Sequence, residues 1–158
     1  MIILGIDPGI ADTGFGVISA EKSTFKAITY GTIKTSKADD LAKRLDYLYK
    51  DIEKLIKKHK PSKIGIESIF FAKNAKTAIT IAHARGICLL AAQKAKAQIH
   101  EYTPLQIKQA LTGYGAADKN QIQQMVKTIL NLKEIPKPDD AADALACAIC
   151  CAQTKQYV

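Results

Sequence analysis

Residues 2–9 read I-I-L-G-I-D-P-G, a short apolar run that ends in an acid and a Pro-Gly pair. An apolar run of this length, bounded by turn residues, is typical of a buried β-strand that leads into a turn. Two β-rich stretches follow, Gly14 to Ser19 and Phe25 to Thr35, and polar residues separate them. The start of the chain therefore predicts a three-stranded antiparallel meander.

The hydrophobic period changes after this meander. Leucine and isoleucine recur every three or four residues between Leu41 and Leu55, which predicts an amphipathic helix that ends before Pro61. A short strand is expected from Lys63 to Glu67, and an Ala-rich helix from about Ala75 to Lys96. Gly86 weakens helix propensity inside that helix, so we expect it to mark a close packing contact.

The last third of the chain predicts one more strand, from Gln98 to Tyr102, and three helices. Three places resemble helix starts: Thr103-Pro104 with Gln106, Asp118 with Gln121, and Asp139 or Asp140 as a cap after Pro136 and Pro138. Strands that alternate with helices imply an α/β fold, in which helices flank a mixed sheet of five strands. The length of 158 residues, without any linker or repeat, indicates a single domain, residues 1–158.

The composition is that of a globular protein with a basic surface. Lysine and arginine number 23 against 15 acids, a formal net charge of +8. This excess suits a nucleic acid, because each neutralised phosphate releases counterions, although many basic proteins bind none. The four cysteines complete no zinc-binding pattern, so we expect buried, reduced thiols. The N-terminus resembles no signal peptide and no stretch approaches membrane-spanning length, which predicts a cytoplasmic protein.

Four carboxylates stand where a stabilising role is hard to find. Asp7 and Glu67 each end an apolar strand, and adjacent strands would open both ends onto one edge of the sheet, where α/β proteins place ligands. Asp140 and Asp143 are three residues apart on the last helix, so they share a face. Each acid has a plainer explanation: a turn for Asp7, an exposed strand end for Glu67, the helix dipole for Asp140.

Taken together, the four acids favour a metal site. Carboxylates that converge on one sheet edge repel one another unless a cation holds them. Several hard oxygen ligands suit Mg²⁺ or Mn²⁺. Two such ions can stabilise both the attacking and the leaving oxygen of a phosphodiester displacement.

Four segments carry a resemblance to a known family. They are G-I-D-P-G-I-A-D-T-G-F-G-V (5–17), I-E-S-I-F-F-A-K-N-A (66–75), G-Y-G-A-A-D-K (113–119) and D-A-A-D-A-L-A (140–146). In order and spacing they resemble the motifs of the RuvC family of Holliday-junction resolvases, the crossover junction endodeoxyribonucleases, which have a ribonuclease-H-like fold. The first motif alone is weak, because actin-like ATPases also carry D-x-G there, but the second and fourth are specific.

The resemblance assigns roles to individual residues. It implies these catalytic residues: Asp7, Glu67, Asp140 and Asp143 as metal ligands, with Lys108 and Lys119 as lysines that stabilise charge in the transition state. It implies these DNA contacts: Phe70 by stacking on an unpaired base, and Lys73, Asn74, Lys76 and Arg85 on the backbone. The alternatives are a core position for Phe70 or Phe71 and a solvated surface position for each lysine.

The implied function is resolution of four-way DNA junctions in recombination and repair. A homodimer would make paired cuts in two strands of like polarity, with Mg²⁺ or Mn²⁺, leaving 5′-phosphate and 3′-hydroxyl ends. The resemblance also implies the RuvA–RuvB branch-migration complex as a partner. Three alternatives remain: a non-catalytic junction-binding protein, an actin-like nucleotide-binding module, and a general nuclease of the same superfamily. The second would need two subdomains, for which 158 residues are too few.

Overall fold

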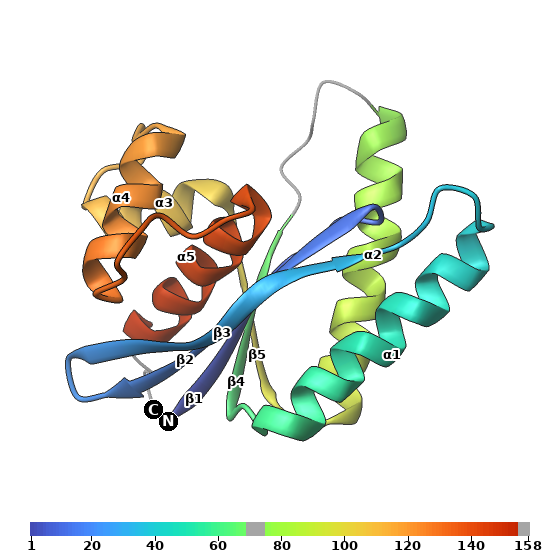
Figure 1. Ribbon diagram of the computed structural model, residues 1–158, viewed down its shortest axis with the longest axis horizontal. Coiled ribbons are helices and arrows are strands. Elements are labelled where there is room, and N and C mark those ends of the chain that lie inside the picture. Colours follow the sequence, from blue (N-terminus) through green and yellow to red (C-terminus); the bar gives the residue numbers. More distant parts are fainter. Residues whose placement is uncertain (69–74, 155–158) are drawn as a thin grey trace.

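The computed structural model describes residues 1–68 and 75–154, which are built around a five-stranded mixed sheet (Figure 1). The strands are β1 (Ile2–Asp7), β2 (Asp12–Glu21), β3 (Thr24–Lys34), β4 (Lys63–Glu67) and β5 (Gln98–Tyr102). Their order across the sheet is β3-β2-β1-β4-β5. The first three form the antiparallel meander, and β4 and β5 continue it in parallel with β1. The predicted α/β fold with a mixed sheet is confirmed.

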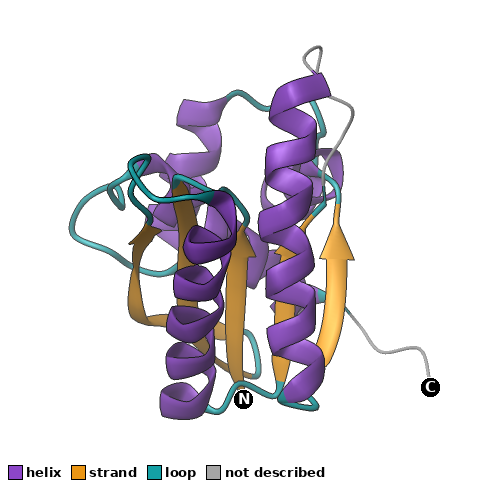
Figure 2. Ribbon diagram, turned by 90° about the vertical axis from the view of Figure 1, so that its right-hand side faces the viewer, coloured by secondary structure: helices purple, strands orange, loops and turns teal. Residues whose placement is uncertain are grey.

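Helices cover both faces of this sheet. One face carries α1 (Leu41–His59) and α2 (Ala75–Lys94), which lie in front of the strands in Figure 2. The other carries α3 (Pro104–Thr112), α4 (Lys119–Ile129) and α5 (Asp139–Gln153) (Figure 1). Strand β1 is buried on both sides: Ile3 packs into the core under α3–α5, and Leu4 and Ile6 pack into the core under α1 and α2. Because each face of β1 contacts a different core, successive residues of this strand from Ile2 to Ile6 are all apolar or glycine.

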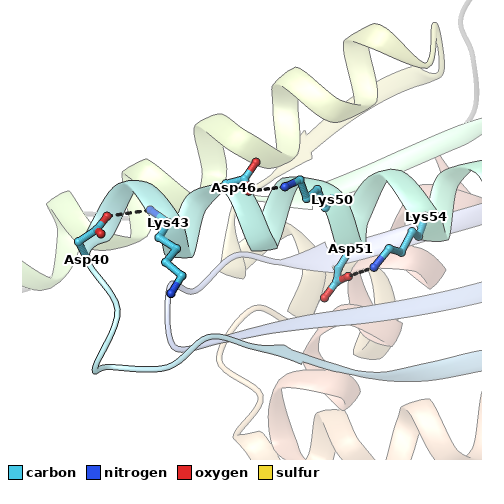
Figure 3. A network of polar contacts seen from close by, with 6 residues as sticks. All are labelled: Asp40, Lys43, Asp46, Lys50, Asp51 and Lys54. Carbon is cyan, nitrogen blue, oxygen red and sulfur yellow. Dashed lines mark hydrogen bonds and ion pairs between the residues drawn. The ribbon is translucent and has the colours of Figure 1, made fainter.

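Helix α1 follows directly from its sequence pattern. Asp40 caps it by accepting a hydrogen bond from the Lys43 amide at 2.9 Å. Its buried side chains are Leu48, Ile52 and Ile56. Ion pairs line its exposed face, among them Asp46–Lys50 at 2.6 Å and Asp51–Lys54 at 2.8 Å (Figure 3). Exposed pairs of this kind each add at most about 0.5 kcal/mol to the helix.

Helix α5 lies closest to the centre of the sheet because glycines face it. A Cβ atom on Gly5 would lie 2.0 Å from the carbonyl oxygen of Ala144, and one on Gly14 would lie 1.9 Å from that of Asp140. These approaches are possible only without a side chain, so β1 and β2 admit the helix backbone itself. Most alanines of α5 are buried: Ala141, Ala142, Ala144, Ala146 and Ala148. The start of α5 is therefore held against β2.

The structure corrects two expectations. Gly86 does not mark a close contact, since an added Cβ would meet nothing within 4 Å; it lies on the exposed side of α2, opposite buried Ala84 and Cys88. Neither Asp139 nor Asp140 caps α5: the cap position is Pro138, with no side-chain hydrogen bond, and both acids lie in the first helical turn. Their side chains face neighbouring groups instead.

Other expectations are confirmed. Capping boxes begin α3, where Thr103 pairs with Gln106, and α4, where Asp118 pairs with Gln121. All four cysteines are buried free thiols. Within residues 1–68 and 75–154, none of the helices has the length and apolar character needed to cross a bilayer.

Candidate metal centre

Two of the predicted acids end neighbouring parallel strands. Ile6 of β1 pairs in register with Ile66 of β4, so the next residues, Asp7 and Glu67, lie side by side at the same edge of the sheet. Both side chains are half-buried. The parallel pairing puts two carboxylates together that are 60 positions apart in the chain (67 minus 7).

The other two acids come from the first turns of α5. Close packing against Gly14 brings Asp140 to the strand end, and Asp143 follows on the same helix face. Asp7, Asp140 and Asp143 each offer an oxygen such that these atoms all lie within 4.8 Å of one another. Glu67 is not part of that group of three, but its carboxyl interacts with those of Asp7 and Asp143. The structure therefore gathers all four acids around one point.

Burial, and after it repulsion between the carboxylates, raises the pKa of every acid in this group. Burial raises the pKa of Asp7 to about 8, and the charge of Glu67 adds to the effect. Burial and the charge of Asp143 raise the pKa of Glu67 to about 7. Burial also raises the pKa of Asp140 and Asp143, against the opposing charge of Lys119. Ionising the whole group is therefore unfavourable without a compensating cation.

The donor set fits a hard divalent cation. Among the described residues, the group offers carboxylate oxygens and no sulfur or imidazole ligand. Mg²⁺ and Mn²⁺ prefer such oxygen ligands, whereas softer metals do not. A bound cation would also offset the burial of the ionised carboxylates and the repulsion between them, which together raise the pKa values. The residues present can hold a divalent metal.

Two lysines border the acids. Lys119, the first residue of α4, has its Nζ 3.0 Å from Asp139 Oδ2 and 3.6 Å from Asp143 Oδ2. Lys108 of α3 is close enough for its charge to lower the pKa of Glu67. Both lysines line a cavity of about 250 Å³ together with these residues: Glu67, Pro104, Ile107, Ile122, Asp143 and Ala146. The lining of the cavity thus combines basic, acidic and apolar side chains, and it includes two members of the acid group, Glu67 and Asp143.

The predicted DNA-contacting residues are only partly visible. Phe70, Lys73 and Asn74 lie outside the described residues. Lys76 is exposed in the first turn of α2. Arg85, farther along α2, forms an ion pair with Glu101 of β5, so its guanidinium is already engaged within the chain.

Sequence reasoning missed two contributors to the site. Asp139 was expected to cap α5 but contacts Lys119 and accepts a hydrogen bond from Gln123 Nε2 at 3.1 Å. Asp12, at the start of β2, adds its negative charge beside Asp140 and pairs with Lys34 at 3.7 Å. Neither position carries a distinguishing signal, because each acid stands beside a more prominent motif residue.

A mixed sheet of this order, with acids from β1, β4 and the last helix at one edge, defines a ribonuclease-H-like protein whose carboxylates can hold a divalent metal. The family model "Crossover junction endodeoxyribonuclease RuvC" matches residues 3–151. The chain belongs to the RuvC family.

Proteins of the same description are similar along nearly their whole length. The relative from Alkaliphilus oremlandii is 51% identical over 157 residues, 99% of this chain and 96% of that protein. The relative from Desulforamulus reducens is 56% identical over 153 residues, 97% and 94% of the two chains. The structure of Thermus thermophilus RuvC matches with a TM-score of 0.89 and 34% identity, covering 95% of this chain and 92% of that one. The same protein in complex with a Holliday junction substrate matches with a TM-score of 0.87 at 32% identity, with the same coverage.

Proposed function

We propose that this chain is a Holliday-junction resolvase, a metal-dependent endonuclease that cuts two strands of like polarity. The observation that carries the proposal is the convergence of Asp7, Asp140 and Asp143 within 4.8 Å, in a chain that matches the family over residues 3–151. Glu67 completes the proposed ligand set. The chain acts as one nuclease domain of residues 1–158 and works in the cytoplasm in recombination and repair.

The four acids would hold Mg²⁺, for which Mn²⁺ substitutes, with two ions in each centre. When bound, such ions would supply an activated water for attack on the phosphodiester and would offset charge on the leaving oxygen. Water would attack the phosphorus directly, without a covalent intermediate with the protein. The bond from phosphorus to the 3′ oxygen would break, so the products would carry 5′-phosphate and 3′-hydroxyl ends.

The lysines contribute through electrostatics. Lys119 and Lys108 face the cavity beside Glu67 and Asp143, so a phosphate that enters there meets two positive charges. Negative charge grows on the phosphate oxygens as the attacking oxygen approaches, and a fixed ammonium group stabilises it. Their positions on α3 and α4, both begun by capping boxes, hold the two lysines at defined places.

DNA contacts are proposed along the start of α2 and the segment before it. Phe70 would stack on a base unpaired at the crossover, and Lys73, Asn74 and Lys76 would contact the backbone. Arg85 takes this role only by exchanging Glu101 for a phosphate. The RuvA–RuvB branch-migration complex is the proposed partner that delivers the junction.

A homodimer is proposed because a junction has two-fold symmetry and one chain holds one acid group. The outer face of α2 supports this arrangement. Ile79 is 60% exposed and Leu90 is 47% exposed, and the open space around Gly86 would let a second backbone come close. A monomeric protein at micromolar concentration in sedimentation experiments would contradict the dimer.

The test is cleavage of a synthetic mobile four-way junction, with linear duplex DNA as competitor, with and without Mg²⁺. The wild-type protein should cut the junction only with metal and should prefer it to the duplex. Asp7→Asn should abolish cutting while junction binding stays intact. Asp46→Asn, an exposed change on α1, is the matched control and should cut normally. Binding without cutting by the wild type would favour a non-catalytic protein, and equal cutting of the duplex would favour a general nuclease.

A further inference from the structure

Lys119 is held by two carboxylates of α5 that differ in their surroundings. Its Nζ lies 3.0 Å from Asp139 Oδ2 and 3.6 Å from Asp143 Oδ2. Asp139 also accepts a hydrogen bond from Gln123, which is four residues after Lys119 on the same face of α4. Asp139 thus connects the start of α5 to one face of α4, and it lies closer to the Nζ atom of Lys119 than Asp143 does.

The two carboxylates cannot pair equally well with Lys119 once a metal ion is bound by the acid group. Asp143 belongs to the group of three acids that can hold a metal. A cation on its carboxylate competes for the same oxygens and repels the ammonium group of Lys119. Asp139 lies outside that group and keeps its charge for Lys119.

We propose that Asp139 is a positioning residue that holds Lys119 beside the metal centre during cleavage. This inference rests on the proposed function, in which Lys119 stabilises charge on the phosphate. The capping box of Asp118 and Gln121 fixes the backbone at Lys119, and Asp139 restricts the long side chain that leaves it. A lysine side chain that is not already held loses considerable rotamer freedom when the reaction requires it to take one position.

The Lys119–Asp139 pair is well suited to mutation. The two side chains are 54% and 61% exposed, so the pair adds little to stability and its loss should leave the fold intact. Asp139→Asn keeps the size of the side chain and an oxygen that can accept from Gln123, and it removes the charge.

The first measurement is the single-turnover cleavage rate at saturating junction, in Mg²⁺. Lys119→Ala should lower the rate about a hundredfold or more, and Asp139→Asn should lower it about tenfold. In the Lys119→Ala background, Asp139→Asn should change the rate by less than about twofold, because the group on which it acts is gone. Asp139→Glu should recover part of the loss, and junction affinity should stay within about threefold of wild type throughout. An unchanged rate in Asp139→Asn, or an equal loss in both backgrounds, would overturn the proposal.

The second measurement needs no cleavage. The rate at which an amine-acylating reagent modifies each lysine can be followed by mass spectrometry, with and without Mg²⁺. Asp139→Asn should raise the rate at Lys119 about two- to fivefold, and most strongly with Mg²⁺, while Lys50 is unaffected. Asp46→Asn is the matched control, because Asp46 pairs with Lys50 at 2.6 Å and should show the reverse pattern (Figure 3). If Lys119 reacts at the same rate in both proteins, Asp139 does not hold it.

The two measurements separate failure of this inference from failure of the proposed function. If Lys119→Ala cut at the wild-type rate, the proposed role of Lys119 would be wrong, and the positioning role would be overturned with it. If Lys119→Ala cut slowly but Asp139→Asn cut normally, the proposed function would stand and only the role of Asp139 would be wrong.

Discussion

Asp7→Asn should stabilise the metal-free protein while it abolishes cleavage. Burial raises the pKa of Asp7 in the folded protein to about 8, against an ordinary value of 3.8 in the unfolded chain. The folded state therefore binds this proton more tightly. The corresponding stability is fully present below about pH 4 and is lost as the pH rises from there through the folded pKa near 8.

The size of the effect follows from the distance between the two pKa values. At pH 7, about three of the four units that separate them have been crossed, and each unit corresponds to about 1.4 kcal/mol, so the loss is on the order of 4 kcal/mol. Asparagine has nearly the same shape and never carries the charge. The metal-free variant should therefore exceed the wild type by a few kcal/mol at pH 7 and by almost nothing below pH 4. Its Tm should rise by about 3 °C for each kcal/mol.

The assay is thermal and urea unfolding in EDTA between pH 4 and pH 8, repeated with Mg²⁺. Metal should stabilise the wild type by binding its folded state, and the gain should be smaller in Asp7→Asn because one ligand is missing. Asp46→Asn on α1 should follow the wild type at every pH. An Asp7→Asn protein that is no more stable than the wild type at pH 8 in EDTA would refute the reasoning, since ionising the buried Asp7 beside the other acids would then cost the fold nothing.

Three further predictions concern single residues. Gly14→Ala should lower the free energy of unfolding by about 2 kcal/mol or more and weaken metal binding in calorimetry, because its Cβ meets the backbone of α5. Gly86→Ala, in open space, should be neutral or up to about 1 kcal/mol stabilising. Similar losses of stability in both variants would refute the packing argument. Lys119→Ala should slow single-turnover cleavage about a hundred- to thousandfold with little change in affinity, and a collapse of affinity at normal rate would make Lys119 a backbone anchor. Phe70→Ala should impair junction processing more than Phe71→Ala, by about 1–3 kcal/mol of lost stacking, and unfolding of the Phe70 variant would place that ring in the core instead.

Much of the fold was predictable because its signals are local. A run such as Ile2–Ile6 that ends in Asp-Pro-Gly needs no partner to be recognised as a strand, and the Thr103–Gln106 and Asp118–Gln121 pairs specify helix starts by themselves. The convergence of the acids was also predictable, because parallel strands end at a common edge. What the pattern could not give is the contact between side chains of α4 and α5, such as that of Lys119 with Asp139.

Asp139 and Gly86 show where prediction stopped. An aspartate after a proline at the start of a helix usually caps it, but here Lys119 and Gln123 of α4 compete for the carboxylate and Pro138 takes the cap position. A glycine within a helix often marks tight packing, but here the glycines that pack against α5 lie on the strands, among them Gly5 and Gly14. Both outcomes depend on tertiary neighbours that are far away in sequence.

Helix α5 both packs against the sheet and carries two acids of the candidate metal centre, and the second role opposes stability. Its small alanine side chains, and the glycines Gly5 and Gly14 of the strands, let α5 pack close to the sheet. This packing brings Asp140 and Asp143 close to Asp7. The positive end of the helix dipole favours Asp140 in the first turn and offsets part of the repulsion. Burial first, and repulsion after it, keep the pKa values of these acids raised, so their ionised forms oppose folding in the metal-free protein. Replacing an acid of this centre by its amide should therefore increase stability and remove activity together, the trade-off expected where a fold preorganises a charged site.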